Sequence, residues 1–357
     1  MNEKPAVLLG MDLEELKRLA ISGGMPAFTG KQLAEWIYKK RATDFSVMNN
    51  ISKKGREWLT ENCIIGREQP LERIKSSDGT VKYLFKAGET WDSGNKARGR
   101  RIEAVMIPDR ERATLCVSSQ AGCRMNCYFC ATGRNGFFGN LTAAQILNQI
   151  LTVGADLHKT SQEEEDLTNI VFMGMGEPLD NFPEVKRAVK VLTADWGLAW
   201  SPKRITVSTV GKLPQLKELL DETKVHVAVS LHLPYENQRE QMMPAQKAFP
   251  ITSVIKVLKG CDFSGQRRLS FEYIMWKGVN DDIASAKALV ALIQGLHCRV
   301  NLIRFHKIPG VDLEPATEER MIMFRNYLNS HGITSTIRAS RGEDIMAACG
   351  MLAGKDC

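Results

Sequence analysis

The stretch ATLCVSSQAGCRMNCYFC, residues 113–130, decides the fold class of this chain. Its first seven residues are mostly apolar and predict a short buried strand. Three cysteines follow this strand, Cys123, Cys127 and Cys130. In parallel α/β sheets, ligands bind where the carboxyl ends of the strands meet. We therefore expect a parallel sheet whose first strand leads into a site built around these three thiols.

Five more strand-like runs follow, and helical stretches such as 142–157 and 286–296 separate them. The runs are NIVFMGM (169–175), RITVSTV (204–210), VHVAVSL (225–231), LSFEYIM (269–275) and RVNLIRF (299–305). Six strand–helix units in a row predict an α/β fold with a parallel sheet, either curled into a barrel or left open. Polar residues gather at the predicted carboxyl ends of these strands, which is where the fold places ligands.

The residues before the sheet have a different pattern. Apolar residues at helical spacing predict short helices within 11–20, 29–40 and 52–62, with Thr29 and Ser52 as N-cap candidates. Alternating segments at 80–88 and 101–109 predict a short antiparallel β linker. We expect a helical accessory domain at 1–70, a β linker at 71–108, a core at 109–340 and a C-terminal loop and tail at 341–357.

The composition is that of a soluble globular protein, with 43% hydrophobic and 25% charged residues among 357. No apolar run approaches the roughly 18 to 20 residues that a membrane span needs. The start, MNEKPAVLLG, lacks the basic-then-apolar order of a signal peptide. We therefore expect a cytoplasmic protein without membrane contact. The net charge of +7 favours a polyanionic partner.

Nine cysteines are many for a reducing compartment, where thiols stay reduced unless they are catalytic or bind metal. A structural zinc site usually has four protein ligands, and this chain has no second CxxC pair, although a distant His or Cys could complete one. A disulfide between neighbouring cysteines would leave one thiol idle. A four-iron cluster normally takes four cysteines, so three would leave one iron open to a ligand. The residues alone leave zinc, disulfide and cluster as alternatives.

Several motifs together resemble a known family. The CxxxCxxC spacing, with Phe129 before the last cysteine, resembles the signature of radical S-adenosylmethionine enzymes. TLCVSSQAGC, VFMGMGEPLDN, VSTVG, VSLH, GVND and RASRGEDIMAACGMLAG narrow the resemblance to the RlmN and Cfr family of RNA methyltransferases. It runs from the helical N-terminus to almost the last residue. It implies a partial (βα)6 barrel of the radical S-adenosylmethionine type with an N-terminal RNA-binding accessory domain.

The resemblance also implies the cofactors. One 4Fe–4S cluster would be held by Cys123, Cys127 and Cys130, and two molecules of S-adenosylmethionine would be used per turnover. The residues that it assigns to S-adenosylmethionine are Gly176, Glu177, Ser208, Ser230, Leu231, His232 and His306. The family usually carries asparagine at the last of these positions. A histidine nitrogen can replace an amide as a donor or acceptor, but its protonation adds a variable.

The resemblance implies that the enzyme methylates carbon 2 of adenine. This carbon is not nucleophilic, so its methylation calls for a radical route. By resemblance, Cys349 accepts a methyl group as S-methylcysteine, and Cys116 resolves the protein–RNA adduct through a transient disulfide with Cys349. Glu103 matches the family's proposed base. Without the resemblance, both thiols would be interpreted as buried structural cysteines, and Glu103 as a solvated strand residue. Cys63, Cys261, Cys298 and Cys357 are interpreted as structural or incidental.

The implied substrates are an adenine in the peptidyl-transferase centre of 23S rRNA and the adenine beside the anticodon of some tRNAs. Lys39, Lys40 and Arg41, together with the basic run from Lys96 to Arg101, could contact phosphates. We also expect a flavodoxin-type electron donor and a monomer. One rival hypothesis is a Cfr-like carbon 8 methyltransferase that confers antibiotic resistance. Another is a zinc-stabilised RNA-binding protein with no catalysis.

Overall fold

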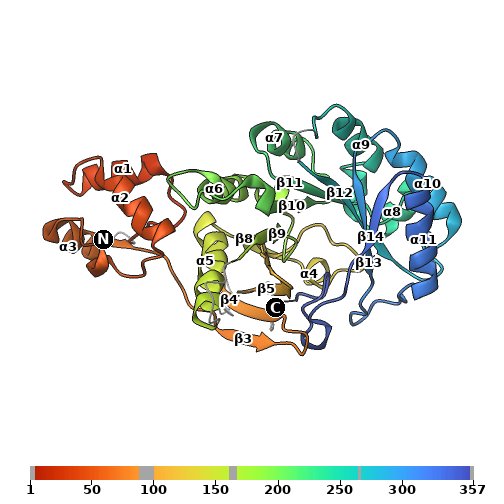
Figure 1. The fold of residues 1–357 in the computed structure, drawn as a ribbon, viewed down its shortest axis with the longest axis horizontal. Coiled ribbons are helices and arrows are strands. Elements are labelled where there is room, and N and C mark those ends of the chain that lie inside the picture. The colour runs from red at the N-terminus through yellow and green to blue at the C-terminus, as the bar shows by residue number, and fades with distance from the viewer. Residues whose placement is uncertain (1–4, 88–99, 161–166, 264–266, 354–357) are drawn as a thin grey trace, which may run out of the picture. The chain divides into compact units, whose positions relative to one another are not determined.

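The computed structural model describes residues 5–87, 100–160, 167–263 and 267–353 (Figure 1). The chain forms two compact units, each assembled from three separate stretches. The first unit contains Met1–Pro70, Leu141–Leu167 and Asn181–Ser201. The second contains Leu71–Asn140, Thr168–Asp180 and Pro202–Cys357.

The second unit is built on a parallel sheet that confirms the predicted fold class. Its parallel strands, in spatial order, are β6 (Arg112–Cys116), β9 (Asn169–Phe172), β10 (Ile205–Thr209), β11 (His226–Ser230), β12 (Leu269–Met275), β13 (Arg299–Arg304) and β14 (Thr334–Ile337). Each strand pairs in parallel with the next, for example Val229 with Phe271. All six predicted strands are present, and β14 is a further parallel strand that the sequence interpretation missed.

An antiparallel extension continues the same sheet beyond β6. It consists of β5 (Arg101–Asp109), β4 (Val81–Lys86) and β3 (Glu72–Lys75), in that order. The sheet therefore has ten strands within the described part of the chain. A separate ribbon of β7 (Gln120–Gly122) and β8 (Phe137–Asn140) brackets the three-cysteine segment and the short helix α4 (Ala131–Arg134).

Helices of the second unit connect the parallel strands and lie around the outside of β11–β14 in Figure 1. They are α7 (Gln215–Glu222), α8 (Glu236–Met242), α9 (Ile251–Lys259), α10 (Ile283–Ile293) and α11 (Glu318–Ser330). Single 3-10 turns are η3 (Pro178–Asn181), η4 (Pro202–Arg204), η5 (Pro244–Lys247) and η6 (Glu343–Ile345). In α9 the buried residues are Ile251, Val254, Ile255 and Leu258, which is the apolar stripe of a helix packed on one face.

The first unit is mainly helical. Its elements are α1 (Leu13–Ser22), α2 (Thr29–Ala34), the π-helical turn η1 (Glu35–Lys39), the 3-10 turn η2 (Phe45–Val47), α3 (Lys53–Asn62), α5 (Ala143–Thr160), α6 (Phe182–Thr193) and the strand pair β1 (Ala6–Val7) and β2 (Cys63–Ile64). No helix in the described ranges is long and apolar enough to cross a membrane.

The helix starts of this unit test the predicted caps. Ser52 caps α3 as predicted, because its side chain accepts a hydrogen bond from the Gly55 amide at 3.1 Å. The prediction for Thr29 is wrong. Phe28 already has helical backbone angles, so it occupies the cap position, and Thr29 is the first helical residue. Asp12, which was not predicted, caps α1 through the Glu15 amide at 2.9 Å.

Candidate active site

Two adjoining pockets contain most of the predicted site residues. The three-cysteine pocket is lined by Cys123, Cys127 and Cys130, together with Gly176, Glu177, Ser208, Ser230, His232 and Cys349. The two-cysteine pocket is named for Cys116 and Cys349, and it is also lined by Cys130, Met173, His306, Arg338 and others. Cys130 and Cys349 line both pockets. The folded chain therefore brings residues more than 200 positions apart into one continuous site.

The three cysteines lie on a tightly turned loop. The Cys123 amide donates to the Gly136 carbonyl at 2.8 Å, and the Cys130 amide donates to the Cys127 carbonyl at 3.2 Å. A Cβ atom at Gly133 would stand 3.0 Å from the Cys127 nitrogen, so glycine lets the helix after the loop pack closely against the loop backbone. Burial, with the neighbouring thiols, raises the pKa of Cys127 well above its ordinary value.

The sulfur donors of this loop fit an iron–sulfur cluster. Burial raises the pKa of Cys123 to about 12, and a bound metal would offset that cost by stabilising the thiolate. Across residues 5–87, 100–160, 167–263 and 267–353, no three His, Cys, Asp or Glu side chains converge on one point as ligands of a single metal ion do. Cluster ligation does not need such convergence, because each cysteine binds its own iron.

Glu177 is held at the turn after β9. Its carboxylate accepts hydrogen bonds from the Leu179 amide at 3.0 Å and the Val210 amide at 2.9 Å. Burial raises the pKa of Glu177 to about 7, while these hydrogen bonds oppose the shift. A carboxylate can accept about four hydrogen bonds, so Glu177 retains capacity to accept one from a ligand.

Gly176 brings the backbone close to β7 just before Glu177. Its φ is +101°, and a Cβ atom there would stand 2.5 Å from the Gln120 Cβ. The same Gln120 side chain accepts a hydrogen bond from the Glu177 amide at 2.9 Å. This turn therefore needs glycine both for its backbone angle and for its packing.

His232 presents one ring nitrogen to the protein. Its Nδ1 accepts a hydrogen bond from the Ile274 amide at 3.1 Å, so the ring proton is on Nε2. Burial, followed by the charge of Arg239, lowers the pKa of His232 to about 3. The imidazole is therefore neutral at ordinary pH, and its Nε2–H is a hydrogen-bond donor.

Two residues assigned to S-adenosylmethionine lie apart from the other five. Leu231 is fully buried and does not line the three-cysteine pocket, although its amide fixes the strand end by donating to the Glu272 carbonyl at 3.1 Å. His306 lines the two-cysteine pocket, where its Nδ1 is 3.3 Å from a Glu343 carboxylate oxygen.

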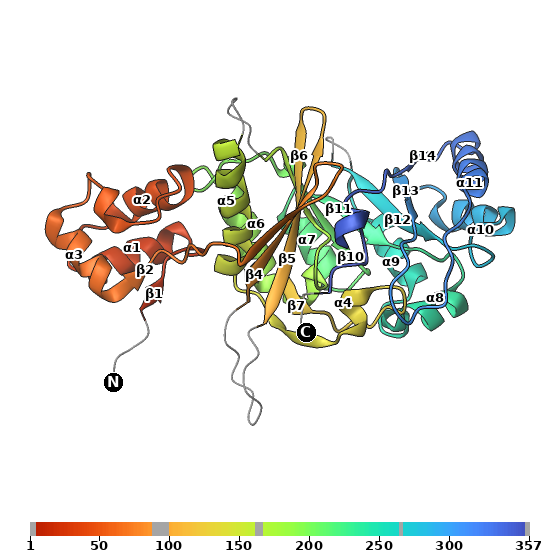
Figure 2. The same ribbon diagram turned by 90° about the horizontal axis from the view of Figure 1, so that it is seen from below.

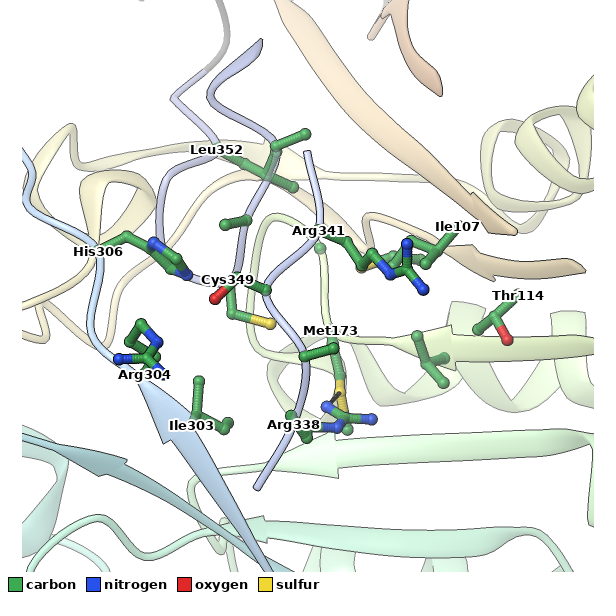
Figure 3. Close-up of a pocket in the computed structure, with 18 of the residues that line it drawn as sticks. Ile107, Thr114, Met173, Ile303, Arg304, His306, Arg338, Arg341, Cys349 and Leu352 are labelled. Atoms are coloured by element: carbon green, nitrogen blue, oxygen red, sulfur yellow. Dashed lines mark hydrogen bonds between the residues drawn. The ribbon is translucent and has the colours of Figure 1, made fainter. Parts of the chain in front are cut away.

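Cys116 and Cys349 both line the two-cysteine pocket but differ in their exposure. Cys116 is buried at the end of β6. Cys349 is exposed, and Figure 3 shows its side chain in the pocket. Burial raises the pKa of Cys116 to about 12, and the charge of Arg338 opposes that shift. Desolvation by the surrounding protein also raises the pKa of Cys349, and the charge of Arg338 again opposes the shift. All cysteines in the described part of the chain are free thiols.

Arg338 is a pocket residue that the sequence interpretation missed. Its guanidinium lies 3.5 Å from a Glu272 carboxylate oxygen and 3.7 Å from the Met173 sulfur. Figure 3 shows Arg338 and Cys349 entering the pocket from the same C-terminal segment. The available signal was an arginine directly after β14 at the carboxyl edge of the sheet, but β14 itself was not predicted.

Glu103 does not line either pocket. It is 2% exposed on β5 and forms an ion pair with Lys82 of β4, with 3.3 Å between nitrogen and oxygen. Its other carboxylate oxygen accepts a hydrogen bond from the Ala353 amide at 3.1 Å. Glu103 is therefore buried, unlike the solvated residue that its alternating strand alone would suggest, and it contacts the segment that carries Cys349.

Comparison with known proteins identifies the family of this chain. Residues 7–65 match the model of the ribosomal RNA large subunit methyltransferase N-terminal domain, and residues 117–289 match the radical SAM superfamily. A probable dual-specificity RNA methyltransferase RlmN of Porphyromonas gingivalis is 54% identical over 98% of this chain and 94% of its own length. This chain belongs to the RlmN family.

Other relatives support the same family. The probable dual-specificity RNA methyltransferase RlmN of Bacteroides thetaiotaomicron is 54% identical over 97% of this chain and 95% of its own length. The dual-specificity RNA methyltransferase RlmN of Campylobacter concisus is 41% identical over 97% and 90%. The crystal structure of a radical SAM methyltransferase from Sphaerobacter thermophilus covers 98% of this chain and all of its own, with a TM-score of 0.89 and 35% identity.

Membership of the RlmN family makes the chain an enzyme, a radical S-adenosylmethionine methyltransferase, and implies a 4Fe–4S cluster and S-adenosylmethionine. The family's N-terminal domain corresponds to the helices that carry the predicted basic residues. Lys39 is exposed, and Lys40 is 3.2 Å from Glu35 and lies over the Trp36 ring. Lys96 and Arg98 lie outside the described residues.

Proposed function

We propose that this chain methylates carbon 2 of adenine in 23S rRNA and in tRNA. One observation carries the proposal: Cys349 lines both pockets, one with the three cysteines and the other with Cys116. A residue that takes a methyl group from a cofactor and delivers it to a base must be accessible from both sides. The names of the relatives, which describe dual-specificity RNA methyltransferases, support RNA as the substrate class.

Cys123, Cys127 and Cys130 would hold the cluster as thiolates, which leaves one iron without a protein ligand. When bound, the cluster supplies the electron that cleaves the sulfonium of S-adenosylmethionine. Glu177 would accept a hydrogen bond from the methionine ammonium, and the turn at Gly176 would bring the backbone close to it. Ser208, Ser230 and the Nε2–H of His232 would donate to the methionine carboxylate and the ribose.

The two pocket thiols would perform the transfer. The Cys349 sulfur accepts the methyl group of one S-adenosylmethionine, loses its proton and carries the methyl as a thioether. To bond to carbon 2 of the adenine, the methyl carbon would first lose one hydrogen atom to the radical that the second S-adenosylmethionine supplies, and the adduct would then release one electron to the cluster and the carbon 2 proton. The Cys116 thiolate would attack the Cys349 sulfur, which breaks the bond between that sulfur and the carbon, and the freed carbon would take up a proton to complete the new methyl group. The product leaves with its new methyl group, and an external dithiol reopens the resulting disulfide. The role of Glu103 as base stays a prediction.

The substrate must reach the two-cysteine pocket as an unpaired or flipped base, because carbon 2 of a stacked and paired adenine is inaccessible to a thiol inside a protein pocket. Lys39 and its basic neighbours would contact phosphates, and binding would weaken with salt. A flavodoxin-type electron donor, a monomeric state and a cytoplasmic location are parts of the same proposal.

The experiment is mass mapping of the methylated adenine after reaction of the reconstituted enzyme with a 23S rRNA fragment and with tRNA. We expect methylation at carbon 2 in both RNAs and none with Cys349→Ala. Cys261→Ala is the matched control, because Cys261 lines neither pocket and should leave the yield unchanged. Methylation at carbon 8 would instead support the Cfr-like activity, and full product from Cys349→Ala would reject the methyl-carrier role.

A further inference from the structure

The Cys349 loop, residues 342–353, is tied to the sheet at its start. The Gly342 amide donates to an Asp78 carboxylate oxygen at 2.9 Å, and Asp78 belongs to the turn between β3 and β4. The Asp344 carboxylate accepts hydrogen bonds from the Ser76 hydroxyl at 2.5 Å and the Ser77 amide at 3.0 Å. Figure 2 shows this dark blue segment beside β5 and α4.

A buried ion pair holds the same loop on both sides of Cys349. Lys82 Nζ donates to the Met346 carbonyl at 3.4 Å, three residues before Cys349. Glu103 accepts from the Ala353 amide at 3.1 Å, four residues after it. The side chains of Lys82 and Glu103 are only 6% and 3% exposed, and neither residue lines the three-cysteine or the two-cysteine pocket.

The register of the sheet explains how the two charges meet. Lys82 pairs with Val105 and Leu84 pairs with Glu103, so the two charged side chains are diagonal neighbours on one face of the antiparallel β4–β5 pair. Removing two charges from water is costly, and a buried pair is retained when it also satisfies other buried polar groups. Here the additional partners are backbone groups of the Cys349 loop.

We propose that Lys82 and Glu103 form a positioning pair that fixes the Cys349 loop, so that Cys349 stays at the junction of the two pockets. The proposal rests on Cys349 being the methyl carrier. A third tether comes from α4, next to the three cysteines: the Ala131 amide donates to the Gly350 carbonyl at 2.8 Å, and the Thr132 hydroxyl to the Leu352 carbonyl at 2.5 Å. Together, the ion pair and α4 hold the loop by hydrogen bonds to residues on both sides of Cys349.

The test measures the loop directly, without RNA, in the full-length protein. Lys82→Met should speed amide hydrogen exchange in peptides covering 342–353 by about tenfold or more. The variant lacks the hydrogen bond from Lys82 to the Met346 carbonyl and the ion pair with Glu103, so local opening of the loop costs less free energy. Alkylation of Cys349 should also become faster, and exchange in β10–β12 should not change. Lys75→Met is the matched control, since Lys75 is an exposed lysine of β3 and should change neither rate. Unchanged loop exchange in Lys82→Met would overturn the proposal.

Two further variants separate this role from others. If Lys82→Met fails to fold, the double variant Lys82→Met with Glu103→Met removes both buried charges together, and it should show the same faster loop exchange. Slow loop exchange in this double variant would also overturn the proposal. Glu103→Gln should loosen the loop, whereas a residue acting only as a base would lose product with loop exchange unchanged. A parent enzyme with no methyl on Cys349 would contradict the proposed function, while the exchange rates would still report on the pair.

Discussion

Single residues of the site owe their chemistry to burial. His232 is neutral because it is enclosed by protein and because its Nδ1 is committed to a backbone amide. Cys116 remains a protonated thiol at neutral pH because burial raises its pKa to about 12. In the proposed mechanism, Cys116 becomes a nucleophile only after a change at the site favours its thiolate. The positive charge of Arg338, in the same pocket, opposes the rise in the pKa of Cys116 and so favours its thiolate.

The depressed pKa of His232 predicts a pH-dependent stability. Its folded pKa is about 3 and its unfolded pKa about 6.5, so the unfolded chain binds the proton more tightly. The stabilisation is present above pH 6.5 and is lost as the pH falls toward 3. From pH 7 to pH 5 this one group should lower the free energy of unfolding by about 2 kcal/mol.

The measurement is urea unfolding at pH 7 and pH 5 for the parent and for His232→Gln. The variant should lose stability at both values, but its stability should fall less between them, by the amount that His232 contributes. Equal pH dependence in the two proteins would contradict the assigned ionisation of His232.

Local sequence patterns indicate which side chains lie together, whereas partnerships that depend on strand pairing leave no such pattern. Cys123, Cys127 and Cys130 lie in one pocket because eight consecutive residues form the loop that carries them. The burial of Lys82 and its ion pair with Glu103 could not be predicted. Strand alternation places Lys82 on the same face as apolar Leu84, and no nearby sequence pattern indicates Glu103 as its partner. That partnership depends on strand register.

At the scale of elements, the turn between β9 and η3 connects fold to site. It combines the φ of +101° at Gly176 with the hydrogen bonds of Glu177. Polar residues at strand ends predicted this position, because parallel strands present their carboxyl ends at one edge. The contact with β7 was not predictable, because the β7–β8 ribbon has no alternating pattern of its own.

Gly176→Ala should be much more damaging than alanine at Gly332, a positive-φ glycine with open space around it. The new Cβ would stand 2.5 Å from the Gln120 Cβ, in addition to the unfavourable φ, so the free energy of unfolding should fall by about 3 kcal/mol. S-adenosylmethionine binding should weaken with it.

Gly332→Ala is the control for backbone strain alone. Gly332 has a φ of +77° with no atom within 4 Å of the new Cβ, so the cost should be about 1 kcal/mol. Chemical unfolding and equilibrium binding of S-adenosylmethionine compare the two variants. Equal costs would show that the contact with Gln120 is not important.

At the scale of the whole molecule, the order of strands was predictable and the compact units were not. Six strands follow one another in the sheet in chain order, which is the simplest topology for successive strand–helix units. The grouping of α5 and α6 with residues 1–70 depends on contacts between segments far apart in the chain. Hydrophobic periodicity identifies such helices without showing which neighbours they contact. The predicted domain boundaries stay a prediction.

The central claim is that Cys349 carries a methyl group beside a cluster held by three cysteines. The most direct measurement is anaerobic purification and reconstitution, followed by iron and sulfide analysis and mass spectrometry of the peptide that contains Cys349. We expect about four irons per chain and, after incubation with S-adenosylmethionine, a methyl group on Cys349. Zinc in place of iron, or an unmodified Cys349 after that incubation, would contradict the account.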